Sequence, residues 1–233
     1  MNTHYNVSPC DCLCGLGESI CWDDKIVIGV RITSWNVNGL RPALKRTAHK
    51  SLLSFLNSLD ADIVCLQETK LLPGDITRDL AVVPGWEAFY CCTRTARPYS
   101  GVATYVKTEG ISAASLLPYS VEEGLLREGA TFSKACVESP PASHPSAPTP
   151  SDCEALRALH DEGRVLESDH GAFVLFNIYA PAVTSPDEEA AAARFALRLA
   201  FYAALTARWQ ALAARGRRVV VVGDFNICGD ALD

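Results

Sequence analysis

The chain has 233 residues, of which 48% are hydrophobic, and a formal net charge of −6. This length allows one large domain or two small ones, and the apolar content is ample for a core. The acidic balance argues against a protein that coats nucleic acid, because such proteins are basic. It leaves a nuclease open, since a nuclease gathers carboxylates for metal and needs only a local basic patch. No apolar run approaches the roughly 18 residues of a membrane span, so we expect no membrane partner.

Residues 1–25 are predicted to be an irregular N-terminal extension. They carry a cluster of cysteines, Cys10, Cys12, Cys14 and Cys21. The spacing of these cysteines is not that of a common zinc module. The segment has acidic residues and no long apolar stretch, so it resembles neither a signal peptide nor an Arg-rich transit peptide. We therefore expect the folded domain to occupy residues 26–233.

The remaining sequence alternates between strand-like and helix-like patterns. Strands are predicted at 26–37, 62–67, 86–93, 101–107, 111–117, 165–168, 172–179 and 219–222. Helical segments are predicted at 44–59, 77–83, 153–160 and 187–215. Residues 138–152 are rich in proline and serine and are expected to form a loop. Because strands come in pairs with helices inserted between them, we expect an α+β fold of two sheets packed face to face, with helices outside.

The long helix at 187–215 carries an apolar stripe that is expected to pack in the core. The stripe consists of Phe195, Leu199, Tyr202, Leu205, Trp209 and Leu212. The helix is followed by Gly216, a residue type that is common just after helix C-termini.

Polar residues follow the ends of four predicted strands. They are Asn36 and Asn38 after the first strand, Glu68 after the second, Tyr179 near the end of a later one, and Asp224 and Asn226 after the last. Taken singly, a glutamate after a strand is usually a solvated loop residue, and an asparagine there is usually part of a turn. Asp224 and Asn226 are two residues apart, so their side chains are predicted to point to the same side. Together, the order and separation of the four groups favour a shared site.

Hydrolysis of a phosphodiester explains this set of residue types. Mg²⁺ prefers oxygen ligands and needs only one or two protein carboxylates, a role that suits Glu68 with Asn36 beside it. Asp224 is suited to orienting or deprotonating the attacking water. Asn226 can donate an N–H, and Tyr179 an O–H, to the phosphoryl oxygen that gains charge. The residues therefore indicate a metal-dependent phosphodiesterase.

Six motifs occur in an order that resembles a known family. They are Ser-Trp-Asn-x-Asn-Gly-x-Arg, Asp-Ile-Val-Cys-Leu-Gln-Glu-Thr-Lys, Tyr-Ser-Gly-Val-Ala-Thr, Glu-Gly-Arg, Asn-x-Tyr-x-Pro and Gly-Asp-x-Asn. Over about residues 30–233 the chain resembles the exonuclease III family of apurinic/apyrimidinic (AP) endonucleases, within the endonuclease/exonuclease/phosphatase superfamily. Asn38, residues 99–104 and the arginine-rich long helix resemble the AP endonuclease 2 branch of that family.

The resemblance implies a four-layer α/β-sandwich whose C-terminal part is missing from this sequence. It implies that the metal is served by Asn36, Glu68, Asp224 and Asn226. The catalytic residues that it implies are Tyr179, Asp224 and Asn226. The residues that it places near DNA are Arg41, Lys45, Arg46, Tyr99 and Arg164. For the basic residues in this set, the alternative is a solvated helix face.

The implied activity is Mg²⁺-dependent DNA repair, with Mn²⁺ as the alternative ion. The implied substrate is double-stranded DNA that contains abasic sites or blocked 3′ ends. The reactions are those of an AP endonuclease and of a 3′–5′ exonuclease or 3′-end-cleaning enzyme in base excision repair. Ala182 stands where other members carry Asn, so the balance between the two reactions stays open. The implied location is the nucleus, with the mitochondrion as the alternative.

The sequence departs from the family pattern after Gly-Asp-x-Asn. A second metal-binding Asp and a Ser-Asp-His motif are expected well beyond it, at positions that the sequence up to Asp233 does not reach. Ser168-Asp169-His170 precedes the Asn-x-Tyr strand, and we interpret it as a hairpin turn. We expect the 233-residue chain by itself to be poorly soluble and inactive, because an incomplete sandwich exposes apolar surface.

Two other interpretations stay open. Another phosphoesterase of the superfamily, acting on inositol phosphates or sphingomyelin, would keep Glu68 and Asp224 but has no reason to match Tyr-Ser-Gly-Val. A non-catalytic DNA-binding module would bind duplex DNA with a salt-dependent affinity and show no metal-dependent turnover.

Overall fold

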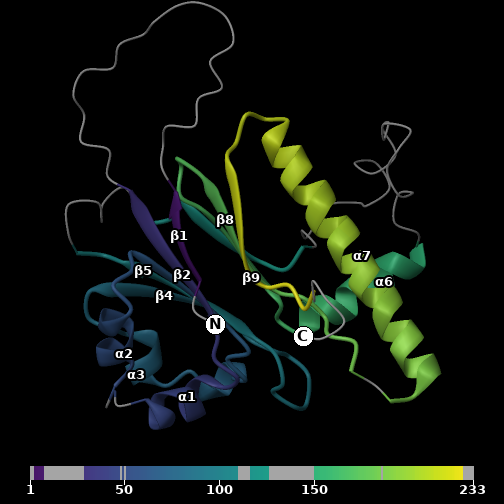
Figure 1. Cartoon of the computed structure of the whole chain (residues 1–233), viewed down its shortest axis with the longest axis horizontal. Helices are drawn as coiled ribbons and strands as arrows, with labels where there is room; N and C mark the ends of the chain where they lie inside the picture. The colour runs from purple at the N-terminus through teal and green to yellow at the C-terminus, as the bar shows by residue number, and fades with distance from the viewer. Residues whose placement is uncertain are drawn as a thin grey trace, which may run out of the picture.

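The computed structural model describes residues 3–7, 29–47, 49, 51–109, 116–125, 150–184 and 186–227. In these residues two β-sheets pack face to face, and helices cover the outer face of each sheet (Figure 1). This order of helix, sheet, sheet and helix confirms the α+β sandwich predicted from the sequence.

The first sheet has the strand order β1-β2-β3-β5-β4. Its strands are β1 (Thr3–Val7), β2 (Val30–Asn36), β3 (Ile63–Gln67), β4 (Trp86–Cys91) and β5 (Val102–Lys107). β2 and β3 run parallel, and the other neighbouring strands pair antiparallel. The helical segments on this side are α1 (Leu40–Arg46), α2 (Leu52–Ser58), η1 (Pro73–Asp75) and α3 (Arg78–Ala81).

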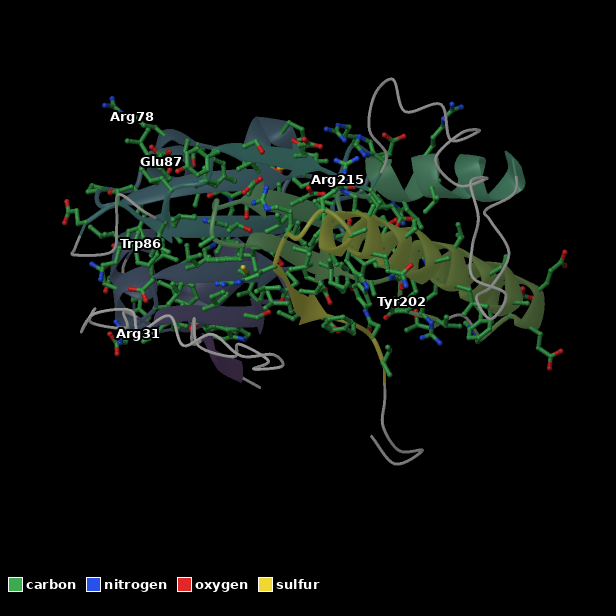
Figure 2. All side chains as sticks on the ribbon, turned by 90° about the horizontal axis from the view of Figure 1, so that it is seen from above. Arg31, Arg78, Trp86, Glu87, Tyr202 and Arg215 are labelled. Atoms are coloured by element: carbon green, nitrogen blue, oxygen red, sulfur yellow. The ribbon has the colours of Figure 1, made fainter. Side chains whose placement is uncertain are left out.

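The second sheet has the strand order β6-β7-β8-β9. Its strands are β6 (Ser120–Glu123), β7 (Val165–Asp169), β8 (Val174–Tyr179) and β9 (Val219–Asp224). β8 and β9 run parallel. The helices on its outer face are α6 (Pro150–Asp161) and α7 (Glu188–Ala213). Seen from above, α7 passes beside β9, and Tyr202 lies near the end of that strand (Figure 2).

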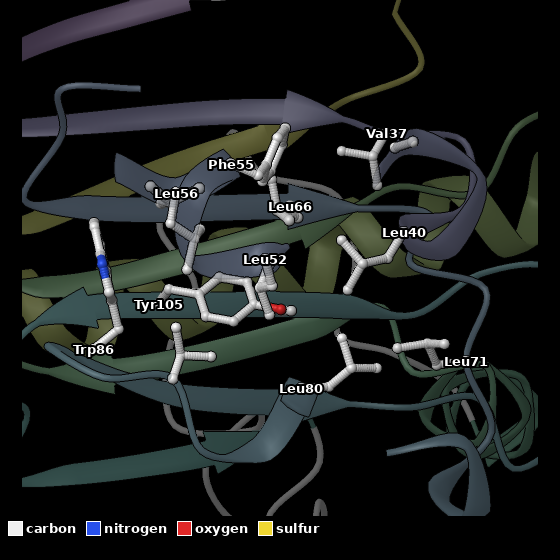
Figure 3. Close-up of a cluster of buried hydrophobic side chains, with 14 of the residues drawn as sticks. Val37, Leu40, Leu52, Phe55, Leu56, Leu66, Leu71, Leu80, Trp86 and Tyr105 are labelled. Atoms are coloured by element: carbon white, nitrogen blue, oxygen red, sulfur yellow. The ribbon is translucent and has the colours of Figure 1, made fainter. Parts of the chain in front are cut away.

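Strand β3 shows how the sequence specifies a layer that is covered on both faces. All of its residues are buried. Ile63 and Cys65 pack with the second sheet, whereas Val64 and Leu66 pack against the helices of the first sheet. Figure 3 shows Leu66 in the cluster on that side. Because alternate side chains of a strand face opposite sides, an apolar residue at nearly every position requires cover on both.

The structure differs from the sequence analysis within the predicted N-terminal extension. Residues Thr3–Val7, expected to be irregular, form β1 and pair antiparallel with β2. The segment contains the β-favouring residues Thr3, Tyr5 and Val7, and β2 offers it an open edge. The cysteine cluster lies outside the described residues, as does most of the strand predicted at 111–117.

The helix predicted at 44–59 is divided into α1 and α2. α1 ends at the extended residue Thr47. α2 begins after Ser51, whose side-chain oxygen accepts a hydrogen bond from the backbone N–H of Ser54 at 3.2 Å. A serine N-cap of this kind starts a new helix, and the apolar periodicity alone did not reveal the break. The predicted loop 138–152 also ends early, because Pro150 begins α6; residues 138–149 lie outside the described residues.

The prediction for the apolar stripe of α7 is wrong in part. Phe195, Leu199 and Trp209 are 45%, 53% and 37% exposed, respectively. The buried side of the helix instead carries Phe201, Ala204, Leu205 and Leu212. Apolar residues lie around most of this alanine-rich helix, so their spacing does not determine which side packs.

By length and composition, α7 is also a candidate membrane span, with a mean hydropathy of 1.2. Two ion pairs tie it to neighbouring segments of the same chain, Arg194 with Glu162 at 2.8 Å and Arg208 with Glu167 at 2.6 Å. Phe201 packs in the core beneath it. We therefore interpret α7 as a helix that covers the second sheet.

Candidate active site

The polar residues predicted from the strand ends meet at one edge of the sandwich. The parallel pairs β2–β3 and β8–β9 end there, one pair from each sheet. The Asn36 Nδ2 atom donates to Glu68 Oε1 at 2.8 Å and to Asp224 Oδ2 at 2.7 Å. One carboxamide therefore joins the carboxylates of the two sheets.

The surroundings of Glu68 favour the ionised form of its side chain. Its Oε2 atom lies 3.0 Å from Lys70 Nζ. Burial by itself raises the pKa of Glu68, but hydrogen bonds from Asn36, Lys70 and Tyr179 outweigh burial and lower the pKa below its ordinary value of 4.5. At neutral pH this side chain therefore carries a negative charge.

Tyr179 lies between this carboxylate and a buried arginine. In the β8–β9 ladder it is paired in register with Asp224. Burial and the negative charge of Glu68 raise the pKa of Tyr179 well above its ordinary value of 10. The Arg164 guanidinium lies 4.7 Å from the centre of its ring. Tyr179 therefore remains a hydrogen-bond donor at neutral pH.

Asp224 is engaged through both of its oxygens. Oδ2 accepts from Asn36, and Oδ1 accepts from the backbone N–H of Asn226 at 2.9 Å. The preceding Gly223 has φ +141°, and a Cβ atom there would collide with the carbonyl of Ile178. Only glycine lets β9 come this close to β8 before it presents Asp224.

Asn226 is placed differently from the expectation. β9 ends at Asp224, and Asn226 has a left-handed φ of +50°, so the alternation of a strand does not orient it. Its Nδ2 atom donates to the carbonyl of Ala180 at 2.8 Å. The residue is thus beside Asp224, held by the segment that follows Tyr179.

Residues with a left-handed backbone conformation are concentrated at this site. The described non-glycine residues with positive φ are Asn38, Asp60, Glu68, Lys70 and Asn226. All of these except Asp60 lie in the segments that form the site. Such conformations are disfavoured for residues with a Cβ and persist where the surrounding structure fixes them, so the cluster marks a constrained functional edge.

The donor atoms fit a hard divalent cation. Glu68 and Asp224 supply carboxylate oxygens, and Asn38 adds an amide oxygen. The Lys70 ammonium lies 2.5 Å from Asn38 Oδ1 as well as beside Glu68, so these oxygens already attract a positive charge. Within the described ranges no group of three His, Cys, Asp or Glu side chains comes together. The potential ligands are therefore mainly oxygen atoms, the donors that hard divalent cations prefer.

The residues predicted to contact DNA divide into two sets. Arg41, Lys45 and Arg46 are exposed on α1, which follows the end of β2 directly. Tyr99 is 38% exposed. Arg164, in contrast, is 2% exposed, and its NH1 donates to the carbonyls of Tyr179 and Ala180 at 2.9 and 3.3 Å. Its guanidinium is thus engaged within the chain, beside Tyr179, and the contact of Arg164 with DNA stays a prediction.

The structure also adds residues that the sequence analysis did not single out. Lys70 lies two residues after Glu68, a proximity visible in the sequence. Glu162 holds Arg164 and Arg194, which come from different parts of the chain. The motif Glu-Gly-Arg gave a signal for Glu162, but nothing in the sequence linked it to Arg194.

The interpretation of Ser168-Asp169-His170 as a hairpin turn is right in part: Ser168 and Asp169 are the last two residues of β7, and His170 begins the turn to β8. Ser168 Oγ and His170 Nε2 are 2.9 Å apart, and Asp169 pairs with Arg217. The turn precedes the first residue of β8, whereas Tyr179 is the last. The motif therefore lies at the opposite end of the sheet from the candidate site.

Named relatives match this chain over most of its length. DNA-(apurinic or apyrimidinic site) endonuclease 2 of Mus musculus is 33% identical over 222 residues, which cover 88% of this chain and 40% of the relative. The protein of the same name from Schizosaccharomyces pombe is 30% identical over 214 residues, which cover 88% and 38%. The chain thus spans about 40% of the length of such curated relatives.

Solved structures share the fold. The catalytic domain of Xenopus laevis APE2 has a TM-score of 0.62 and 30% identity, and the match covers 87% of this chain and 60% of that one. The AP endonuclease LMAP from Leishmania major has a TM-score of 0.60 over 87% of this chain and 56% of its own, at 23% identity, which supports the fold alone.

The sequence also matches a family description, endonuclease/exonuclease/phosphatase, over residues 33–233. Members of that family generally depend on a divalent metal. The matched range contains β3, β8, β9, the second half of β2 and all the polar residues that meet at the ends of these strands. The chain belongs to the endonuclease/exonuclease/phosphatase family.

Proposed function

We propose that this protein hydrolyses phosphodiester bonds of damaged DNA, as an AP endonuclease and as a 3′–5′ exonuclease or 3′-end-cleaning enzyme in base excision repair. The observation that carries the proposal is the bridge from Asn36 to Glu68 and Asp224, which brings two carboxylates from different sheets to one point. Relatives at about 30% identity are named as endonucleases for abasic sites. The substrate that we propose is double-stranded DNA with abasic sites or blocked 3′ ends.

The proposed cofactor is Mg²⁺, with Mn²⁺ as the alternative. Glu68 and Asn36 would hold the ion, Asn36 through its Oδ1 atom, which now accepts from the backbone N–H of Asn38, with Asp224 and Asn226 at its edge and the Asn38 amide oxygen as a further donor. When bound, a divalent cation supplies positive charge to the phosphoryl oxygens. Glu68 offers the ion a charged carboxylate, because its hydrogen-bond donors lower its pKa.

The chain's own residues supply the remaining chemistry. Asp224, fixed through both oxygens, accepts a proton from the attacking water. Tyr179 stays protonated and donates its O–H toward the site, where Glu68 now accepts it. The Asn226 carboxamide, anchored on the carbonyl of Ala180 through one N–H, has a second N–H for an oxygen that gains charge.

DNA contact is assigned to the exposed basic face of α1. Arg41, Lys45 and Arg46 are exposed on α1, which begins shortly after β2 ends, and their positive charges can neutralise phosphates. Tyr99, partly exposed and 5.8 Å from the Arg164 guanidinium, is a further contact residue. We place the protein in the nucleus, where repair of chromosomal DNA occurs, with the mitochondrion as the alternative; a fluorescent fusion tests this assignment.

The test is cleavage by the protein expressed at the full length of its reading frame. A duplex with one abasic site should be cut in Mg²⁺ and left intact in EDTA, and Glu68→Ala should raise the Mg²⁺ concentration required and slow the reaction strongly. Wild-type activity of this variant at low Mg²⁺ would remove Glu68 from the metal site.

The same protein separates the competing functions. Release of phosphate from a phosphoinositide, with duplex DNA untouched, would identify a different phosphoesterase. Salt-dependent binding of duplex DNA without metal-dependent turnover would identify a binding module.

A further inference from the structure

Three polar residues of α7 lie one helical turn apart and all reach toward the candidate site. They are Arg194, Arg198 and Tyr202. Residues at positions i, i+4 and i+8 of a helix lie along one side, so they form a single row. We call them the α7 row. Each contacts a segment that carries a site residue, and Figure 2 shows Tyr202 where α7 passes the end of β9.

The first contact of the α7 row leads to Tyr179. Arg194 donates from NH1 and NH2 to the two oxygens of Glu162, at 2.8 and 3.0 Å. Glu162 in turn accepts from Nε of Arg164, whose side chain is 2% exposed. Arg164 then lies over the ring of Tyr179 and binds its carbonyl. The chain of contacts from helix to tyrosine consists of charged groups with little solvent around them.

The second contact leads to Asn226. Arg198 NH1 donates to the carbonyl of Asn226 at 3.1 Å, and the Tyr202 hydroxyl donates to the carbonyl of Phe225. On its other side, Asn226 is held by Asp224 Oδ1 and by the carbonyl of Ala180. The left-handed turn after β9 is therefore fixed by hydrogen bonds from the helix as well as from the sheet.

We propose that the α7 row positions the two ends of the site, Tyr179 through Glu162 and Arg164, and Asn226 through its own carbonyl. Arg194, Arg198 and Tyr202 are positioning residues in this proposal, and it rests on the function proposed above. Arg198 and Tyr202 bind backbone carbonyls, and Arg194 binds a carboxylate that a second arginine also binds. These contacts restrain the geometry of the site without touching the phosphate. Loss of groups that orient metal ligands in this way typically lowers metal affinity or activity about 10- to 100-fold.

The same helix contains a matched control. Arg208 binds the two oxygens of Glu167 at 2.8 and 2.6 Å, so its chemistry is that of the Arg194–Glu162 pair. Glu167 lies in the middle of β7, away from the strand ends that form the site. Loss of either the Arg208–Glu167 or the Arg194–Glu162 pair removes one bidentate ion pair between α7 and a neighbouring segment. Only the Arg194–Glu162 pair leads on to Tyr179.

The experiment compares Arg194→Gln, Arg198→Gln and Tyr202→Phe with Arg208→Gln in the full-length protein. Hydrogen exchange of residues 223–227 should accelerate in Arg198→Gln and Tyr202→Phe, and stay at the wild-type rate in Arg208→Gln. The Kd for Mn²⁺, measured by calorimetry, should rise roughly 10-fold or more in Arg198→Gln, as is typical when an outer partner of a metal ligand is lost. In Arg194→Gln, kcat on abasic-site DNA should fall at an unchanged KM for DNA.

Two results would overturn the proposal. One is an unchanged exchange rate at 223–227 in both Arg198→Gln and Tyr202→Phe. The other is a loss of kcat and metal affinity in Arg208→Gln equal to the loss in Arg194→Gln, which would mean that the row acts only through stability. If wild-type protein neither binds Mn²⁺ nor cuts DNA, the proposed function fails, while the exchange rates still decide whether the α7 row holds the turn.

Discussion

The side chains of Gln67 and Asn177 meet between the two sheets, where Gln67 Nε2 donates to Asn177 Oδ1 at 2.8 Å. Both are almost fully buried, at 1% and 0% exposure. Asn177 also donates to the carbonyl of Ala103 at 2.8 Å and to Thr104 Oγ1 at 3.2 Å. Gln67 directly precedes Glu68, and Asn177 is two residues before Tyr179. A buried polar bridge thus fixes the sheets relative to each other just behind the site.

Replacing Asn177 should destabilise the fold more than an exposed asparagine would. Asn177→Ala leaves the amide of Gln67 and the carbonyl of Ala103 without this partner in a buried layer, at about 1–3 kcal/mol per group. Urea unfolding measures the loss. Asn57→Ala is the control, because Asn57 is exposed and its Oδ1 atom accepts one hydrogen bond, from Trp86 Nε1. Equal losses from the two variants would contradict the importance of the bridge.

A second prediction concerns Glu162 and the pH dependence of stability. Tyr99, Arg164 and Arg194 donate hydrogen bonds that outweigh burial and lower the pKa of Glu162 from 4.5 to about 2. A carboxyl with a lowered pKa stabilises the fold above its unfolded pKa and loses that effect as pH falls through the folded value. The contribution, roughly 3 kcal/mol from the size of this shift, should therefore be complete above pH 4.5 and disappear toward pH 2.

The comparison of wild type with Glu162→Gln checks this assignment. Gln cannot titrate, so the difference in unfolding free energy between the two proteins should be largest at pH 6 and shrink steadily as the pH is lowered. A difference that stays constant from pH 6 to pH 2.5 would mean that the ion pairs of Glu162 do not stabilise the fold.

The strands and the residues at their ends could be predicted because their signals are local. An apolar run such as Ile63–Leu66 indicates a buried strand, and Glu68 comes two residues after that run. When such strands end at one edge, their polar residues come together, as Asn36, Glu68 and Asp224 do. This reasoning needs only the position of each strand end.

The environment of Arg164 could not be predicted in this way, because its partners are distant in sequence. Tyr99 and Tyr179 lie beside Arg164, and Arg194 binds its ion-pair partner Glu162. These three residues come from different parts of the chain. An arginine beside a motif looks exposed until the fold buries it. Similarly, the left-handed turn at Asn226 depends on hydrogen bonds from α7 and from Ala180, which no strand pattern contains.

A third prediction concerns Asp224→Asn. Both oxygens of Asp224 accept hydrogen bonds, from Asn36 Nδ2 and from the N–H of Asn226. An asparagine has one acceptor, so either orientation turns its NH₂ group against one of these donors. With the proton acceptor gone, turnover on abasic-site DNA should fall by at least about 10²-fold, while DNA affinity persists because the basic residues of α1 are unchanged.

Single-turnover cleavage and a DNA-binding titration measure the two effects separately. Asp60→Asn is the control, because this substitution also removes one negative charge and Asp60 pairs with Arg31 at the surface. A substantial residual rate in Asp224→Asn would mean that the water is activated by another group.

The last prediction concerns the pair Tyr179 and Glu68. The Tyr179 hydroxyl donates to Glu68, and this bond is one of those that lower the pKa of the carboxyl. Tyr179→Phe keeps the ring beside Arg164 but removes that bond, so Glu68 becomes protonated at a higher pH. The acid limb of the profile of kcat against pH should therefore move to higher pH, and kcat on its plateau should fall about 10²-fold if the O–H also serves the transition state.

The rate measured from pH 4 to pH 8 at saturating Mg²⁺ tests both effects. Tyr90→Phe is the matched control, because the Tyr90 hydroxyl is also hydrogen-bonded, to the carbonyl of Leu80, but lies in the core of the first sheet. If kcat on the plateau falls but the acid limb does not move, Tyr179 acts as a donor to the substrate. The acid limb then reports the titration of a group other than Glu68. If the profile of kcat against pH matches that of wild type in both variants, the Tyr179 hydroxyl takes no part in catalysis.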